Sequence, residues 1–236
     1  MGAMAEPLSK ELLDQLRELD TPTVCNALEV VAPDRRGYGY SISPFFAPRP
    51  HLPPIVGYAR TGKMRAQTPP TASVDEQTRT RLAYYEHIGS APGPTITVIE
   101  DIDDHPGYGA WWGEVNTNVH KGLGSLGVIT NGSIRDLPDS AEGFQLLAGM
   151  PGPSHAWVRV EEFNVPVQVH GMHVEPGDLI HADQHGAVVI PIDVADQVPQ
   201  AAADIAAKEA VLITASQQPG FSAATIYELT GVDPGH

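Results

Sequence analysis

The segment Gly113–Asp139 holds the residue types in this chain best suited to catalysis. Glu114, Asp136 and Asp139 are hard oxygen ligands, which suit magnesium or manganese better than zinc. Arg135 carries the planar guanidinium that binds a carboxylate through two parallel hydrogen bonds. Together these residues predict a site where a divalent cation and an arginine hold a small carboxylic acid. The plainer alternative is a surface ion pair, which Arg-Asp dipeptides more often form.

A helix is expected to supply further hydrogen-bond donors to this site. The sequence Trp112–Leu123 is typical of a helix, and its start falls just after Gly113. The backbone N–H groups of Val115 and Asn116 would then be unpaired donors at the positive end of the helix. Such an end binds a carboxylate or enolate oxygen.

A buried strand and a turn are expected to deliver Arg135 and Asp136. Leu126–Thr130 is typical of a buried strand, and Asn131-Gly132 is typical of a turn. Loops after strands are where α/β proteins place ligands. In an extended backbone adjacent side chains point in opposite directions, so Arg135 and Asp136 need not pair with each other.

The remaining pattern predicts one α/β domain over residues 5–236, without an internal repeat or a clear linker. Helices are expected over Leu8–Leu19, Val24–Val31, Ser73–Ile88, Ser140–Ala148 and Val194–Thr214. Strands are expected over Ile55–Met64, Thr95–Ile99, Ala156–Glu162, Val165–His170, Leu179–Ala182 and Ala187–Ile190, and Pro33–Pro54 is expected to be an irregular loop. Residues Met1–Met4 look like a cloning remnant before a natural start at Met4.

Charge and composition exclude several classes of protein. The net charge is −15, which repels nucleic acid phosphates, and no basic patch offsets it. No stretch is apolar enough to span a membrane. The single cysteine, Cys25, forms no intrachain disulfide, so a reducing compartment such as the cytoplasm is expected. An anionic substrate would therefore need local positive charge, from an arginine, a metal ion or both.

Aromatic and histidine residues near the site are expected to be structural. Ordinary packing explains Trp111 and Trp112, which precede the site. His87 and His120 fall in predicted helices and are expected at their surfaces.

The spacing of the charged residues resembles the family of 4-hydroxy-4-methyl-2-oxoglutarate and 4-carboxy-4-hydroxy-2-oxoadipate aldolases. That family, which includes the regulator of ribonuclease E activity A, has an acidic residue, twenty intervening residues, Arg-Asp, and an acidic residue three positions on. Glu114, Arg135, Asp136 and Asp139 match this motif, in a matching glycine frame. Similar stretches at Thr21–Leu28 and 175–191 extend the resemblance to roughly residues 10–215.

The resemblance implies a layered, swivelling β/β/α fold like a phosphohistidine domain. It also implies homotrimers or homohexamers with sites between subunits. A divalent metal, Mg²⁺ or Mn²⁺, would be held directly by Asp136 and through water by Glu114, with Asp139 close by. A glutamate from the neighbouring subunit would correspond to Glu209.

The implied activity is that of a metal-dependent lyase. It would cleave a 4-hydroxy-2-oxo acid to pyruvate, with oxaloacetate decarboxylation as a possible side reaction. Arg135 and the amides of Val115 and Asn116 would bind the pyruvyl part. Two alternatives stay open: a non-catalytic oligomeric regulator, and a different 2-oxo acid lyase or hydratase. The family's best-known aldolases have Asp at the position of Glu114, and the loops 33–54 and 64–76 are distinctive, so the substrate is expected to differ.

Overall fold

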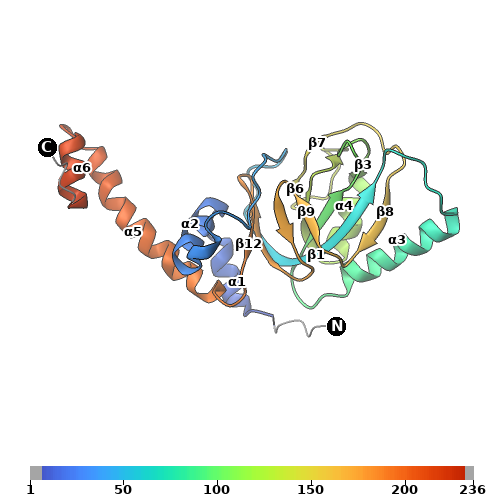
Figure 1. The fold of residues 1–236 in the computed structure, drawn as a ribbon, viewed down its shortest axis with the longest axis horizontal. Helices are drawn as coiled ribbons and strands as arrows, with labels where there is room; N and C mark the ends of the chain where they lie inside the picture. Colours follow the sequence, from blue (N-terminus) through green and yellow to red (C-terminus); the bar gives the residue numbers. More distant parts are fainter. Residues whose placement is uncertain (1–6, 232–236) are drawn as a thin grey trace.

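A curled, seven-stranded sheet organises the chain, which the computed structural model describes over residues 7–231 (Figure 1). Its strand order is β12-β11-β1-β2-β4-β6, and β8 pairs with the far half of β1. The strands are β1 (Ile55–Arg65), β2 (Thr95–Asp101), β4 (Ser125–Thr130), β6 (Gln145–Leu147), β8 (Arg159–Phe163), β11 (Leu179–Asp183) and β12 (Gly186–Ile190). The pairs β1-β2, β2-β4 and β4-β6 are parallel, and the other pairs are antiparallel.

Two smaller sheets complete the strand structure. β9 (Val167–Val169) and β10 (Met172–Val174) form a hairpin. β3 (Ala110–Trp112), β5 (Ser133–Ile134) and β7 (Met150–Pro151) form a parallel sheet in the order β3-β5-β7. Along the chain each of these three strands follows one of the parallel strands β2, β4 and β6. The small sheet therefore continues the main sheet at the carboxyl ends of its strands, where α/β proteins place their sites.

Helices flank the main sheet and extend from both ends of the molecule (Figure 1). They are α1 (Lys10–Arg17), α2 (Thr21–Val31), α3 (Val74–Gly89), α4 (Glu114–Gly122), α5 (Val198–Ser216) and α6 (Ala223–Thr230), with short 3₁₀ turns at Pro33–Arg35 and Ala195–Gln197. Asp20 caps α2, and Ser73 and Glu76 form a reciprocal capping box at the start of α3. Within residues 7–231 no helix is both long and apolar enough to cross a membrane.

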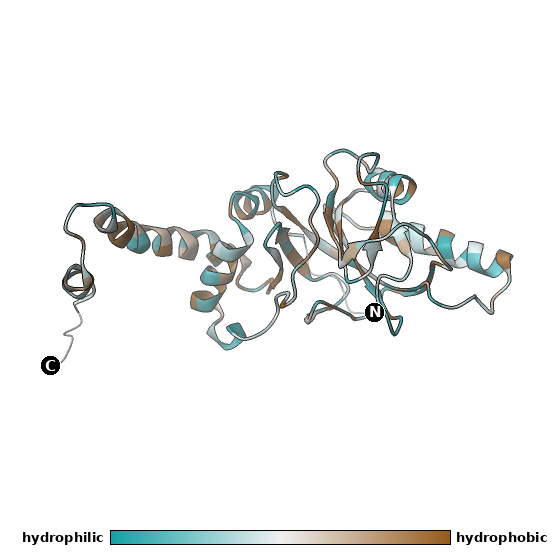
Figure 2. Ribbon diagram, turned by 90° about the horizontal axis from the view of Figure 1, so that it is seen from above, coloured by the Kyte–Doolittle hydropathy of each residue, from teal (hydrophilic) through white to brown (hydrophobic). Residues whose placement is uncertain are grey.

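Apolar side chains fill both faces of the sheet. Figure 2 shows the hydrophobic residues concentrated on the central strands, with hydrophilic residues on the loops. One cluster joins α1, α2 and the start of α5 to β1, β11 and β12. Another cluster contains Trp112, Tyr84, Ile88 and Phe144, and it packs against α4 and the small sheet. Burial of this kind stabilises the fold by roughly 1.5–3 kcal/mol per large side chain.

The predicted fold class is confirmed: the chain folds as a single mixed α/β domain with flanking helices. Most long elements lie where the sequence placed them, within a few residues at their ends. The predicted helix Ser140–Ala148 is wrong, because Gly143 adopts a left-handed turn (φ 69°) and Gln145–Leu147 forms the buried strand β6. Trp112 ends β3, and the helix after it begins at Glu114. Residues Met1–Met4 lie outside the described residues.

Candidate functional site

The pairing of β3 with β5 brings the two halves of the predicted site together. Trp112 pairs with Ile134, and the Arg135 amide donates to the Trp112 carbonyl at 2.8 Å. Each strand ends immediately before its functional residues, so Gly113-Glu114 and Arg135-Asp136 leave the small sheet side by side. The motif residues are thus brought together although twenty residues separate Glu114 from Arg135.

Because Gly113 has no side chain, the Asp136 carboxylate occupies the space where a Cβ atom would lie. A Cβ atom at residue 113 would lie 2.5 Å from Asp136 Oδ2 and 3.2 Å from Arg135 Cγ. The Gly113 backbone is extended (φ −158°), so glycine is needed here for close approach and not for its conformational freedom. The Asp136 carboxylate accepts a long hydrogen bond of 3.4 Å from the Glu114 amide, at the positive end of α4.

Asp136 adopts a left-handed backbone conformation, with φ of 49°. That conformation is uncommon for residues other than glycine, and such strain is often kept at functional sites. It also turns the carboxylate towards its neighbour, so Arg135 Nε lies 3.3 Å from Asp136 Oδ2. The two side chains do not diverge as they would in an extended strand. The pair is partly exposed, with 28% and 37% of the two side chains accessible, so an incoming acid can reach it.

Hydrogen bonds fix the loop that follows Asp136. The Asp136 carbonyl accepts from the amides of Asp139 and Ser140 and from the Ser140 hydroxyl, at 2.9–3.0 Å. The buried Thr117 hydroxyl accepts from the Ala141 amide at 2.9 Å and donates to the Gly113 carbonyl at 2.8 Å. Thr117 therefore ties this loop to the first turn of α4.

Arg49 is a positioning residue that the sequence did not reveal. Its guanidinium donates to the carbonyls of Ala141 and Ser140 at 2.5 and 2.6 Å, and more weakly to those of Leu137 and Phe144 at 3.4 Å or less. One half-buried side chain thus gathers four carbonyl groups of the loop after Asp136. Its only sequence signal is an arginine between two prolines in the proline-rich stretch 33–54, which says nothing about partners some ninety residues away.

His120 supports the first turn of α4 from inside the protein. The expectation of a surface histidine is wrong, because its side chain is fully buried against Trp112, Tyr84 and Tyr85. Its Nδ1 lies 2.7 Å from the Asn116 carbonyl, and its Nε2 lies 2.9 Å from the Tyr84 hydroxyl. A carbonyl only accepts, so Nδ1 carries the proton and Nε2 accepts from Tyr84. Burial lowers the pKa of His120 to about 4, so the ring is neutral at pH 7.

His87, which was also predicted at a helix surface, is not fully exposed. It is half-buried, and Arg60 approaches both its ring and its carbonyl. Burial, and then the charge of Arg60, lower the pKa of His87 to about 4.

The start of α4 offers backbone donors without a side-chain cap. Gly113 occupies the N-cap position and makes no side-chain hydrogen bond to the helix. The Thr117 amide donates to the Gly113 carbonyl, so it is the first amide of α4 with an intrahelical partner. The amides of Val115 and Asn116 precede it, and Val115 is 71% exposed. Neither amide has a hydrogen-bond partner within residues 7–231, and their binding of an anionic oxygen stays a prediction.

The carboxylates suit a hydrated cation better than a dehydrated one. Within residues 7–231 no three Asp, Glu, His or Cys side chains cluster as ready metal ligands. Asp136 sits at the start of α4 beside Glu114, while Asp139 is exposed and contributes only its amide to the turn. Magnesium commonly keeps several waters and takes one or two protein carboxylates. The donor set of Asp136 with Glu114 fits that chemistry, and the space left by Gly113 lets the Asp136 carboxylate come close to the helix end.

A hollow of about 350 Å³ lies beside Arg135 and Asp136. Ile134, Leu137 and the stretch 151–153 of β7 and its loop complete its walls. It is a shallow depression that opens widely to solvent, so a small acid could enter it freely. The small sheet therefore provides both the charged residues and the adjoining space.

Glu209 lies apart from the other predicted site residues within one chain. It is exposed on α5, which Figure 1 shows projecting away from the main sheet beyond β12. The structure brings Glu114, Arg135 and Asp136 together. Glu209, on the projecting part of α5, could contact such a site only in another copy of the chain.

Comparisons with known proteins agree with this architecture. The family model described as "RraA-like: Aldolase/RraA" matches residues 21–189. The uncharacterized protein MJ0644 of Methanocaldococcus jannaschii is 33% identical over 108 residues, which cover 42% of this chain and 49% of that protein. The chain therefore spans about half the length of that relative.

Two solved structures share the fold. An uncharacterized protein from Pseudomonas syringae pv. tomato is 23% identical, with a TM-score of 0.71 and 95% of each chain covered. Streptomyces coelicolor RraAS2, described as an unusual member of the RNase ES inhibitor RraA protein family, is 25% identical, with a TM-score of 0.68. That match covers 87% of this chain and 96% of RraAS2. Together with the family model, which spans most of the sheet and the segment Gly113–Asp139, these findings place the chain in the RraA-like family.

Proposed function

We propose that the protein is a metal-dependent lyase that cleaves a 4-hydroxy-2-oxo acid and releases pyruvate. The RraA-like family includes both 4-hydroxy-4-methyl-2-oxoglutarate aldolases and non-catalytic RNase E inhibitors. One observation favours an enzyme: Asp136, in a left-handed conformation, holds its carboxylate against Arg135 and the uncapped start of α4. A binding scaffold has no need for this strained arrangement.

A divalent cation, Mg²⁺ or Mn²⁺, is the cofactor that this donor set suits. When bound by Asp136, with Glu114 holding one of its waters, the cation supplies a positive charge that polarises the keto group of a 2-oxo acid.

Arg135 and the helix amides recognise the pyruvyl end. The Arg135 guanidinium binds the substrate carboxylate as a fork and neutralises its charge in a strongly acidic protein. The amides of Val115 and Asn116 donate to the oxygen on which negative charge develops as the C–C bond breaks. These amides are fixed by the helix, so they need no rearrangement during the reaction. Loss of one such donor typically lowers the rate about 100- to 1000-fold.

A base must take the proton of the 4-hydroxyl group. We assign this proton transfer to a carboxylate from a neighbouring copy, with Glu209 as its candidate. Proteins of this family are oligomeric. The free end of α5 and helix α6 carry exposed apolar side chains, including Val211, Ile213 and Tyr227 at 55%, 54% and 41% exposure. Such a surface supports packing against another copy, in trimers or in dimers of trimers.

The same charge-stabilising groups would also decarboxylate oxaloacetate, because that reaction too leaves negative charge on the pyruvyl oxygen. Two other functions would give different results in the experiment below. One is a regulator of the kind named for the Streptomyces relative, and the other is a different 2-oxo acid lyase or hydratase. The single cysteine and the acidic surface are in keeping with a cytoplasmic enzyme that binds neither nucleic acid nor membrane.

The experiment is a pyruvate assay coupled to lactate dehydrogenase. Purified protein is given 4-hydroxy-4-methyl-2-oxoglutarate or oxaloacetate, with Mg²⁺, with Mn²⁺ or with EDTA. We expect release with either metal and loss of release in EDTA. No release from either compound under any metal would contradict the lyase and favour a regulator. Metal-dependent release from oxaloacetate alone would favour a different 2-oxo acid lyase.

A further inference from the structure

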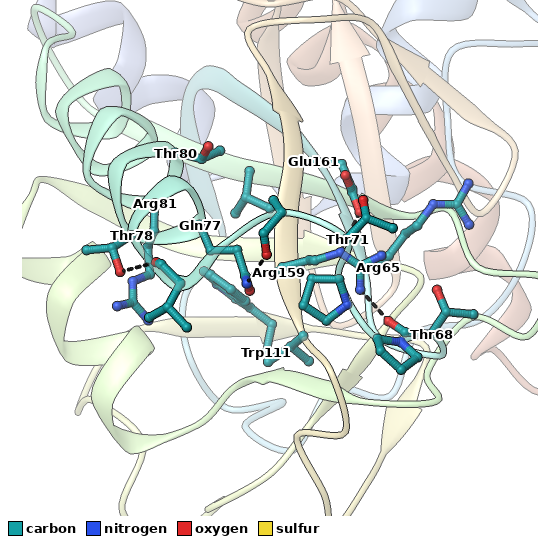
Figure 3. A pocket seen from close by; sticks show the side chains of 16 residues that line it. Arg65, Thr68, Thr71, Gln77, Thr78, Thr80, Arg81, Trp111, Arg159 and Glu161 are labelled. Carbon is teal, nitrogen blue, oxygen red and sulfur yellow. Dashed lines mark hydrogen bonds and ion pairs between the residues drawn. The ribbon is translucent and has the colours of Figure 1, made fainter.

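A second hollow, of about 460 Å³, lies away from the small sheet (Figure 3). Its walls are the first turns of α3, the strand β8, and the loop that joins β1 to α3. None of Glu114, Arg135 and Asp136 lines it.

Three arginines line this hollow although the protein is strongly acidic. The chain has 14 Lys and Arg residues and a net charge of −15, yet Arg65, Arg81 and Arg159 all reach this one space. Glu161 is the only carboxylate among the lining residues. The lining therefore carries an excess of positive charge, which a bound anion would neutralise.

Some guanidinium N–H groups of these arginines have no hydrogen-bond partner within the described residues. Arg159 bonds Glu161 at 2.6 Å and the Thr68 carbonyl at 2.5 Å, so it is held in place with its second terminal nitrogen uncommitted. Arg65 approaches Asp103 only at 3.5 Å.

Asp103 forms a long ion pair with Arg65 through one oxygen, and its other oxygen is used elsewhere. That oxygen accepts from the amides of Ala66 and Gln67 at 2.5 and 2.7 Å. Across residues 7–231, no hydrogen bond or salt bridge engages the Arg81 guanidinium. Arg65 Nη1 thus has one long contact, and Arg65 Nε and Nη2 have no hydrogen-bond partner within residues 7–231.

The rest of the lining suits the carbon skeleton of a ligand. Trp111 is 5% exposed, and its indole N–H has no hydrogen-bond partner within the described part of the chain. Pro69, Pro70 and Val74 add apolar surface. Figure 3 shows Arg81 on the α3 side, with Arg65 and Arg159 on the other side, nearer β8. Positive charge therefore stands at two ends of a partly apolar space.

We propose that this hollow binds a small organic dianion. One acid group lies at Arg81, the other lies at Arg159 and Arg65, and the carbon chain between them packs on Trp111 and the prolines. Guanidinium groups bind carboxylates in forked pairs, and two such groups at a distance select a molecule with two separated acids. This binding site is separate from the proposed lyase site and does not depend on it.

The experiment measures binding by calorimetry at low ionic strength, in EDTA, with the dicarboxylates succinate, glutarate and adipate. These compounds lack a 2-oxo group. The matched ligand is 6-aminohexanoate, which replaces one carboxylate of adipate by an ammonium group. We expect one dicarboxylate to bind at one site per chain, 6-aminohexanoate to bind at least tenfold more weakly, and binding to weaken with salt.

Variants locate the site. Arg81→Gln should weaken binding roughly tenfold, and Arg81→Lys should weaken it less, because it keeps the charge but not the fork. Arg79→Gln is the control, since Arg79 is exposed on the same helix and does not line the hollow. Asp136→Ala should leave binding unchanged. Binding by none of the dicarboxylates, equal loss in Arg79→Gln, or loss only in Arg135→Gln would each overturn the proposal.

Discussion

Gly113 and Asp136 depend on each other at the level of single atoms. The glycine is required because the carboxylate fills the place of its side chain, and the carboxylate comes there because its backbone is left-handed. Residue type and spacing predicted Glu114, Arg135 and Asp136 as one site. They did not predict that Arg135 would pair with Asp136, because that contact depends on one unusual φ angle.

Adding one methyl group at Gly113 tests this dependence. Gly113→Ala should displace the Asp136 carboxylate and lower kcat/KM for metal-dependent pyruvate release about 100-fold or more, as loss of a pre-organised charged group does. The control is Gly122→Ala at the end of α4, since a Cβ there meets no described atom within 4 Å apart from its chain neighbours and the backbone of its own helix. Equal activity in the two variants would show that the close approach has no catalytic role.

Short elements and loops position these residues, and they were the hardest to predict. The strands β3, β5 and β7 have three, two and two residues, which is too short for an alternating pattern to appear. The long strands β1, β2 and β4 were predicted because their β-branched and apolar runs are long enough to be distinctive. The segment Ser140–Ala148 looked helical from composition alone, but tertiary pairing of β6 with β4 overrides that preference.

Arg49 should control the loop after Asp136. Arg49→Ala removes one donor from each of four carbonyl groups, so we expect kcat to fall at least tenfold and the loop to become more open to proteolysis. Arg36→Ala is a suitable control, because Arg36 forms an exposed ion pair with Glu29. Wild-type kcat together with unchanged proteolysis in Arg49→Ala would contradict this role.

The helix α4 should loosen in mild acid through His120. The folded-state pKa of about 4 lies below the unfolded value of 6.5, so the unfolded chain binds more protons between these values. Stability from the neutral ring is complete above about pH 6.5 and is lost as the pH falls towards 4; by pH 5 the loss is about 2 kcal/mol.

Denaturant unfolding at pH 7 and pH 5 measures this effect. His87 shifts in the same direction, so His120→Asn should reduce the acid-induced loss of unfolding free energy without abolishing it. An equal loss in His120→Asn and wild type would show that His120 does not titrate as described.

At the scale of the whole molecule, the C-terminal helices carry an exposed apolar surface. The free end of α5 and helix α6 expose apolar side chains, and Glu209 lies on this projecting part. The family resemblance predicted assembly and a shared site, whereas no sequence pattern in one chain could place α5 against a neighbour. Interfaces of this kind are apolar at their centre, so charge introduced there is disruptive.

Ile213→Asp should therefore shift the protein towards monomers in size-exclusion chromatography with light scattering. Pyruvate release should fall with assembly if the neighbouring copy completes the site. Lys208→Glu changes the charge of the same helix at an exposed position and should leave assembly intact. A monomeric wild type that is fully active would rule out a shared site.

The central claim is that the charge of Asp136 supports metal-dependent cleavage of a 2-oxo acid. Its most direct test is the rate of pyruvate release by Asp136→Asn, because asparagine tolerates the left-handed backbone and removes only the charge. Asp193→Asn, at an exposed carboxylate remote from the motif, is the control. We predict at least a 100-fold loss in Asp136→Asn and none in Asp193→Asn. Undiminished, metal-dependent release by Asp136→Asn would contradict the proposed site.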